Sequence, residues 1–235
     1  MTELKQEEYV KPLEIFSFIK DHLKHEPVTN SAVFALLRIL KQLNPGDTYY
    51  DNYMWHYKKR RNSFVDYYHL LWNMGASLPI NRILEIGCRT GISACQLLAS
   101  KISFEGVKLT LFDLFGDGFL SPNLVLRNLK AIGFPAEQVE IIKGDSLQTV
   151  PAYIETKPEP YDYVLVDGNH DWKYAQKDLE NVLPLIKKGG ILFFDDIAPD
   201  GCKLIDLWQA FKSNHPEFYC TENMDGKGIG VGVRK

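Results

Sequence analysis

The segment Ile83-Leu84-Glu85-Ile86-Gly87-Cys88-Arg89-Thr90-Gly91-Ile92-Ser93 decides the fold of this protein. In this segment an apolar strand runs into an acidic residue and a glycine turn, and an apolar helix follows. Gly87 can adopt a positive φ and leaves room for a ligand beside the backbone, and the start of the helix presents free N–H groups. Gly91 lets the helix pack close to the strand. The spacing differs from the G-x-G-x-x-G of NAD enzymes, and a tight turn without a ligand is the alternative interpretation.

The composition is typical of an ordinary globular protein and excludes several classes of function. Hydrophobic residues make up 45% and charged residues 24% of the 235 positions, enough for a full core. A formal net charge of −3 argues against nucleic-acid binding through a general basic surface. The four cysteines form no C-x-x-C pair, residues 1–20 lack a signal-peptide pattern, and no apolar run is long enough for a membrane span. We expect a cytoplasmic protein without nucleic-acid or membrane partners, and a homo-oligomer is compatible with the sequence.

Residues 1–79 predict an N-terminal helical cap that differs from the rest of the chain. Apolar residues recur at helical spacing in three stretches, which predict helices ending near residue 25, near residue 44 and at Gly75. The aromatic-rich connection at 49–57 predicts a lid over a substrate, with fixed packing of the cap as the alternative. The basic run at 58–61 is interpreted as the solvated start of the third helix. The three apolar stripes are Leu13, Phe16, Ile19 and Leu23; Val33, Leu36, Leu37 and Leu40; and Phe64, Tyr67, Leu71 and Met74.

From residue 80 onward, apolar strands alternate with helical patterns. Near-continuous apolar runs suit parallel strands buried on both faces, and each gap is long enough for a crossover helix. A helix after Asp171 is expected to end at the Lys187-Lys188-Gly189-Gly190 segment, and residues 217–221 and 228–233 predict a hairpin. We therefore predict an α/β fold with a doubly wound, mostly parallel sheet over residues 80–235. The predicted core strands are 80–86, 107–113, 138–142, 161–166 and 190–194.

Every one of these core strands ends on an acidic residue. In open parallel sheets, ligands bind beyond the carboxyl ends of the strands, so acids in this position predict a binding site. Single acids there also serve as helix N-caps, and Asp145, which precedes Ser146 at the start of a helix, fits that alternative equally well. The strand-end acids are Glu85, Asp113, Asp145, Asp167 and the pair Asp195-Asp196.

At the glycine turn the sequence resembles motif I of the class I S-adenosylmethionine-dependent methyltransferases, E-x-G-x-x-x-G. The resemblance implies a Rossmann-like seven-stranded sheet whose last strand is antiparallel, and S-adenosylmethionine as the cofactor. It assigns the ribose hydroxyls to Asp113, at the end of the second strand, and the adenine to the neighbourhood of Asp145. Asp117 lies close enough in the sequence to compete with Asp113. The predicted cofactor-binding residues are Glu85, Gly87, Gly91, Asp113, Asp145 and Ser146.

The fourth and fifth core strands end in potential metal ligands. If these strands are neighbours, Asp167 lies about 5 Å from the Asp195-Asp196 pair. Three carboxylates this close repel one another unless some are protonated or a cation joins them. A hard divalent cation with oxygen ligands fits, and Mg²⁺ is the usual choice. The alternative is that these acids are helix caps and turn residues without a metal.

The motifs at these two strand ends, Asp-x-x-His and Asp-Asp, resemble those of the metal-dependent O-methyltransferases. The most similar branch methylates sugar hydroxyls of macrolide and aminocoumarin natural products. The resemblance implies Asp167, Asp195 and Asp196 as metal ligands and His170 as the general base. Family members with Asp-Gly-Asp use the second Asp as the base, but this chain has Asn169 there, which leaves His170 as the matching base. A histidine at the start of a helix with no chemical role is the alternative.

The sequence predicts a Mg²⁺-dependent O-methyltransferase whose acceptor is a hydroxyl of a small molecule, a sugar or another diol-like natural product. The cofactor carries an activated methyl group, so the protein must position the acceptor oxygen and remove its proton. An unperturbed histidine, with a pKa of about 6.5, suits that task. Three alternatives stay open: a metal-independent small-molecule methyltransferase, an NAD-dependent oxidoreductase and a non-catalytic cofactor-binding protein. The chain lacks the Asn/Asp-Pro-Pro-Tyr/Phe segment of enzymes that methylate nucleobase amino groups.

Overall fold

The structure is a computed structural model that describes residues 11–23, 31–48, 50, 67–116, 118–199 and 202–235. Seven strands of these residues form one sheet. The strands are β1 (Arg82–Ile86), β2 (Lys108–Asp113), β3 (Val139–Lys143), β4 (Tyr161–Val166), β5 (Ile186–Asp195), β6 (Phe218–Asn223) and β7 (Ile229–Arg234). Their order across the sheet is β3-β2-β1-β4-β5-β7-β6. Strands β1 to β5 run parallel, whereas β7 pairs antiparallel with both β5 and β6. The predicted mostly parallel sheet, the antiparallel final strand and the C-terminal hairpin are confirmed.

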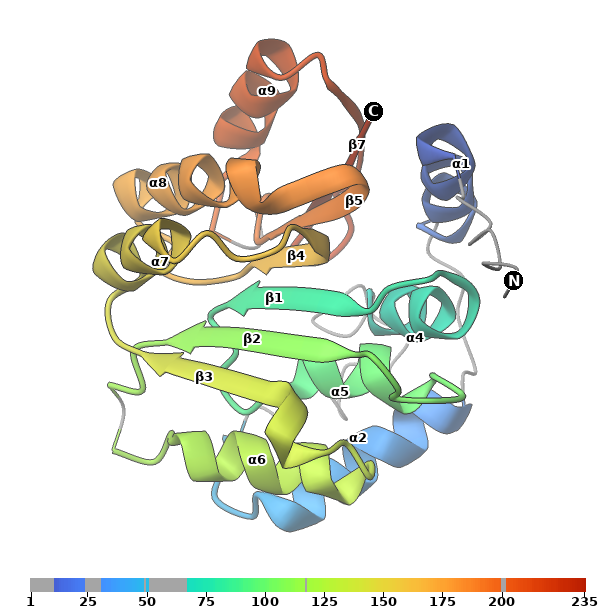
Figure 1. The fold of residues 1–235 in the computed structure, drawn as a ribbon, viewed down its shortest axis with the longest axis vertical. Helices are drawn as coiled ribbons and strands as arrows, with labels where there is room; N and C mark the ends of the chain where they lie inside the picture. The colour runs from blue at the N-terminus through green and yellow to red at the C-terminus, as the bar shows by residue number, and fades with distance from the viewer. Residues whose placement is uncertain (1–10, 24–30, 49, 51–66, 117, 200–201) are drawn as a thin grey trace, which may run out of the picture.

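Helices cover both faces of the sheet (Figure 1). On one face lie α1 (Pro12–His22), α2 (Ser31–Leu43), α4 (Tyr68–Ser77), α5 (Ile92–Ala99) and α6 (Pro122–Ala131). On the other face lie α7 (Ser146–Glu155), α8 (Trp172–Val182) and α9 (Ile205–Asn214). Two short 3₁₀ turns, η1 (Ala136–Gln138) and η2 (Leu183–Leu185), precede β3 and β5.

The core divides along the sheet because successive strand residues point to opposite faces. Ile83 and Phe193 pack with the N-terminal helices, whereas their neighbours Leu84 and Phe194 pack with α7, α8 and α9. Ile19 of α1 is fully buried in the first of these two clusters. The N-terminal helices therefore share a core with the sheet, and the predicted division of the chain into 1–79 and 80–235 stays a prediction.

Two predicted helix ends differ from the structure. Gly75 does not end α4, which continues to Ser77; a Cβ at Gly75 would lie 1.9 Å from the carbonyl oxygen of Leu97, so this glycine allows close packing of α4 on α5. Helix α8 ends at Val182, because Pro184 cannot continue it, and β5 begins before the predicted residue 190. The predicted start of the third N-terminal helix, with Phe64, lies outside the described residues.

The prediction that Leu13 belongs to the buried stripe of α1 is wrong. Leu13 is 55% exposed, whereas Ile15 is buried on the sheet side of the helix. Among the described residues, none of the helices combines the length and the hydropathy needed to span a bilayer.

We predict that Gly230→Ala destabilises the fold. Gly230 pairs with Phe194 across the β5–β7 ladder, and a Cβ at Gly230 would lie 2.5 Å from the fully buried ring of Trp208. Overpacking of this kind costs about 1–3 kcal/mol of unfolding free energy, measured by chemical denaturation. The control is Gly118→Ala, whose Cβ meets open space and whose stability should stay close to that of the original chain. Equal stability of both variants would contradict the prediction.

Candidate functional site

A pocket of about 670 Å³ opens at the carboxyl ends of β1, β2, β3 and β4. This is where the chain reverses its direction of progress across the sheet between β1 and β4, the usual place for a ligand in such folds. Gly91 and Asp195 are the predicted site residues that do not line the pocket. The predicted site residues that do line it are Glu85, Gly87, Asp113, Asp145, Ser146, Asp167, His170 and Asp196.

The glycine turn after β1 has the backbone conformation that its sequence predicts, but for a different physical reason. Gly87 has φ 85°, and a Cβ there would lie 1.8 Å from the carbonyl oxygen of Asp167. The main chain at the end of β4 therefore fills the space beside Gly87, and this contact explains the need for a glycine without a ligand. Gly91 has φ 76° at the N-terminus of α5, where a Cβ would lie 3.2 Å from Val125 of α6. Gly91 therefore shapes the helix start from outside the pocket.

Glu85 is a buried acid at the inner wall of the pocket. Its side chain is buried and accepts a hydrogen bond from the hydroxyl of Ser93 in α5. Burial raises the pKa of Glu85 to about 8, although the Ser93 hydroxyl opposes the shift. A positively charged group arriving in the pocket would favour the ionised form of this carboxyl.

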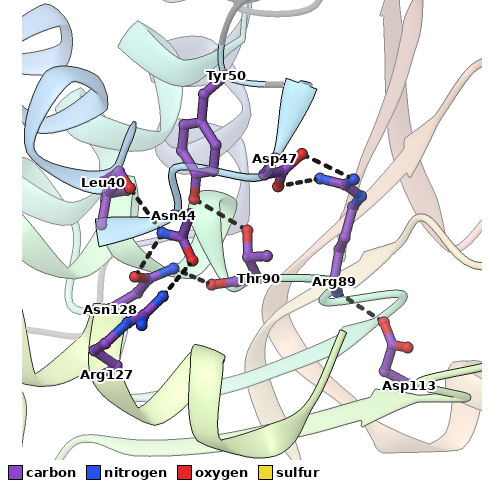
Figure 2. Close-up of polar contacts among 9 residues, drawn as sticks. All are labelled: Leu40, Asn44, Asp47, Tyr50, Arg89, Thr90, Asp113, Arg127 and Asn128. Carbon is purple, nitrogen blue, oxygen red and sulfur yellow. Dashed lines mark hydrogen bonds and ion pairs between the residues drawn. The ribbon is translucent and has the colours of Figure 1, made fainter. Parts of the chain in front are cut away.

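Asp113 is held in place by two backbone N–H groups. One carboxylate oxygen accepts from the N–H of Arg89 and the other from the N–H of Phe115, each at 2.7 Å. Arg89 has φ 51°, an uncommon conformation for a residue with a side chain. Its guanidinium makes two hydrogen bonds to the buried carboxylate of Asp47, at 2.7 and 3.1 Å (Figure 2). An ion pair from the N-terminal segment thus fixes the residue that orients Asp113.

A second set of contacts ties the same N-terminal segment to the glycine turn (Figure 2). The hydroxyl of Tyr50 lies 3.1 Å from the hydroxyl of Thr90. Asn44 donates to the side chain of Asn128 at 2.9 Å, and Asn128 donates to the carbonyl of Thr90, also at 2.9 Å. Arg127 donates to Asn44 at 3.0 Å. Asn44, Tyr50 and α6 therefore hold the glycine turn through Thr90.

The predicted lid falls almost entirely outside the described residues. Of residues 49–57, the structure describes Tyr50, which is fully buried and contacts Thr90. This ring has the fixed packing that was the alternative to a lid. Asp117, the predicted competitor of Asp113, also lies outside the described residues.

Asp145 caps a helix and lines the pocket as well. It is the N-cap of α7, and its Oδ1 accepts from the N–H of Leu147 at 3.0 Å. Its Oδ2 accepts from the hydroxyl of Tyr174 at 3.4 Å. Ser146 donates to the buried Asp178 of α8 at 3.1 Å. The capping alternative is therefore present in the structure, and the predicted adenine contact stays a prediction.

The acids after β4 and β5 converge because these strands are neighbours, with Val166 paired to Phe194. Asp167, Asp195 and Asp196 each offer a carboxylate oxygen, and these atoms lie within 4.8 Å of one another. Burial raises the pKa of Asp195 to about 7. Asp196 has φ 62°, and its Oδ1 is buried without a hydrogen-bond partner among the described residues.

His170 faces this cluster from the end of the loop between β4 and α8, directly before the N-cap Asp171. Its Nε2 lies 2.7 Å from Oδ2 of Asp196 and 3.4 Å from Oδ1 of Asp167. Hydrogen bonds to the two carboxylates outweigh burial and raise the pKa of His170 to about 10. The same contact, together with Lys227, holds the pKa of Asp196 below its usual range despite burial. The unperturbed histidine expected from the sequence is therefore absent, because two acids hold its proton.

A lysine that no sequence motif indicates lies in the middle of this cluster. Nζ of Lys227 lies 3.0 Å from Oδ2 of Asp195 and 3.0 Å from Oδ2 of Asp196. Burial lowers the pKa of this lysine, but the surrounding carboxylates outweigh burial and raise the pKa above its usual range. Lys227 lies in the turn before β7, far along the chain from any acid motif, and its position between Gly226 and Gly228 was the only local signal.

The central part of the chain matches a known family. Residues 84–197, which run from β1 past the end of β5, match the family model of a methyltransferase domain. The matched residues are 114 of the 235 positions, just under half of the chain. This match includes the glycine turn and all the strand-end acids of the methyltransferase. No curated protein matches the chain in sequence.

Solved methyltransferases have the same fold at low sequence identity. An O-methyltransferase from Bacillus cereus, in complex with S-adenosylhomocysteine (SAH), has a TM-score of 0.65 and 17% identity, over 88% of this chain and 92% of that chain. TomG from Streptomyces achromogenes, an O-methyltransferase involved in tomaymycin synthesis, has a TM-score of 0.63 and 18% identity, over 85% and 89%. SAH-bound PaMTH1 from Podospora anserina has a TM-score of 0.63 and 17% identity, over 100% and 98%.

We predict that Asp47→Asn weakens the binding of SAH by about tenfold, because loss of the ion pair frees Arg89, whose N–H orients Asp113. Calorimetric titration with SAH measures the effect. Glu159→Gln is the control, because it removes the exposed ion pair to Arg82 far from the turn and should leave the affinity unchanged. Unchanged affinity in Asp47→Asn would show that the tether serves folding only.

We predict that the imidazole of His170 titrates near pH 10 in the metal-free protein, as followed by NMR of the ring signals. Asp196→Asn should move the pKa toward the ordinary value of about 6.5, because it removes one of the two charges that hold the proton. The sign fixes the stability effect: a raised pKa in the folded state stabilises the protein at low pH, and this contribution disappears as the pH rises toward 10. A ring that titrates near 6.5 before any substitution would contradict the prediction.

Proposed function

We propose that this methyltransferase transfers the methyl group of S-adenosylmethionine to a hydroxyl oxygen of a small molecule. In this proposal Asp167, Asp195 and Asp196 hold Mg²⁺, and His170 accepts the proton. The observation that carries it is the shared pocket: the glycine turn and Asp113 line the same cavity as Asp167, His170 and Asp196. A donor and an acceptor bound there would meet at the ends of adjacent strands β1 and β4.

The cofactor half of the pocket has groups for a charged nucleoside. S-adenosylmethionine, when bound, supplies a methyl group already activated on a sulfonium. Asp113 keeps free lone pairs on both oxygens, and a carboxylate with this freedom accepts hydrogen bonds from two vicinal ribose hydroxyls. Buried Glu85, whose pKa is raised to about 8, would ionise beside a cationic end of the cofactor and pair with it.

The acidic cluster supports the proposed metal by its chemistry. All three side chains offer carboxylate oxygens, the ligands that Mg²⁺ prefers. The buried Oδ1 of Asp196 has no hydrogen-bond partner among the described residues, so a ligand atom remains to be satisfied. Mg²⁺, when bound, supplies a Lewis acid that lowers the pKa of a hydroxyl.

His170 is placed to take a proton but holds one at neutral pH. With both carboxylates ionised, the pKa of about 10 leaves the neutral imidazole as the minor form at pH 7. The base is therefore available only after the charge on Asp167 and Asp196 is compensated or the pH is raised.

The acceptor class rests on the motif resemblance and on the space in the pocket. A cavity of about 670 Å³ lies in the range of small-molecule sites. Among proteins of this fold, TomG is involved in tomaymycin synthesis and CalS11 is a calicheamicin methyltransferase. We propose a sugar or another diol-like natural product as the acceptor.

The test combines binding with methyl transfer to a panel of sugars and other diols. SAH should bind and NAD should not, and Asp113→Ala should weaken SAH binding. Asp196→Asn should abolish stimulation by Mg²⁺ while SAH still binds, and His170→Ala should lower the rate by roughly 10²–10⁴-fold. Binding of NAD in place of SAH would contradict the cofactor assignment. Transfer at full rate after exhaustive chelation would favour the metal-independent alternative.

A further inference from the structure

Lys227 places a positive charge inside the acidic cluster. Its Nζ atom lies 3.0 Å from Oδ2 of Asp195 and 3.0 Å from Oδ2 of Asp196. Both aspartates are almost completely buried, and the lysine side chain is only 22% exposed. One ammonium group therefore bridges two of the three carboxylates proposed to hold Mg²⁺.

The backbone fixes the start of this side chain beside the acids. The carbonyl of Lys227 accepts from the N–H of Ala198 at 2.8 Å, and the carbonyl of Gly228 accepts from the N–H of Ile197 at 3.3 Å. Gly228 has φ 72°, and a Cβ there would lie 2.6 Å from the nitrogen of Ala198. The turn before β7 is thus pressed against the segment that follows Asp196, and Lys227 cannot withdraw as a unit without breaking these contacts.

We propose that Lys227 is a built-in cation of this site: it holds Asp195 and Asp196 together without a metal and lowers the affinity of the site for divalent cations. The inference rests on the proposed function, whose Mg²⁺ ligands include the same two residues. A divalent cation on these carboxylates lies beside an ammonium group, and like charges a few ångströms apart repel. Because Oδ1 of Asp196 stays without a partner among the described residues, the site still offers a ligand atom and binds the cation weakly.

The first experiment measures Mn²⁺ binding to the full chain by calorimetry and electron paramagnetic resonance. Lys227→Met and Lys227→Gln should each bind Mn²⁺ about tenfold or more tightly than the unsubstituted chain, because the repelling charge is gone. Lys227→Arg keeps the charge and should bind weakly. The matched control is Lys212→Met, which removes a lysine paired to Glu222 on α9 and β6, away from the cluster, and should leave Mn²⁺ affinity unchanged.

The second experiment measures thermal stability without and with Mn²⁺. Without the metal, Lys227→Met should melt at a lower temperature than the unsubstituted chain, because two buried carboxylates lose their counter-charge. Saturating Mn²⁺ should recover most of this loss in Lys227→Met, and should raise the melting temperature of Lys212→Met no more than that of the unsubstituted chain.

Three results would overturn the inference. If the neutral variants bound Mn²⁺ no more tightly than the unsubstituted chain, the claim that Lys227 lowers the affinity for divalent cations would be wrong. The proposed metal ligands would be unaffected by that result. If metal-free Lys227→Met were as stable as the unsubstituted chain, the claim that Lys227 holds the two aspartates together without a metal would be wrong. Failure of every variant to bind Mn²⁺ would overturn both the inference and the proposed Mg²⁺ site.

Discussion

Mutual repulsion among the carboxylates at the ends of β4 and β5 is the constraint on which the site depends. Asp167, Asp195 and Asp196 converge because parallel neighbouring strands end at the same edge of the sheet. Such a cluster persists only with compensating positive charge or protonation. Within the part of the chain that the structure describes, the ammonium of Lys227 and the imidazole of His170 compensate these charges. The raised pKa of His170 follows from this balance, because Asp167 and Asp196 hold its proton.

The glycine turn after β1 and the acidic cluster at the ends of β4 and β5 are joined by direct backbone contact. The turn at Gly87 passes so close to the carbonyl of Asp167 that no side chain fits between them. The N–H of Asp167 in turn donates to the carbonyl of Ile86 at 2.9 Å. The distance between the turn and the cluster is therefore set by main-chain geometry, which varies little, and a donor and an acceptor bound on either side would meet in a fixed relation.

The N-terminal region packs on one face of the sheet and reaches the pocket, which Tyr67 and Tyr68 line. Its helices bury residues such as Ile19 and Leu37 in the same core as β1 and β2. Asp47 then reaches Arg89 and thereby fixes the backbone group that holds Asp113. A region that looks like a separate cap in the sequence thus participates in shaping the pocket, through one buried ion pair and a short hydrogen-bonded network.

The sequence by itself determined the strands, the glycine turn and the acids at the strand ends, because alternation, chain-reversing glycines and strand-end positions are local properties. That Asp167 and Asp196 meet was predicted only on the condition that their strands are neighbours, and the strand order of the tertiary structure meets this condition. Only the tertiary structure decided that Gly87 makes room for β4, that Lys227 enters the cluster, and that His170 holds its proton. These features depend on contacts between segments far apart in the chain. A pKa and an ion pair are set by the atoms that surround a group in space, which the local pattern of residues does not encode.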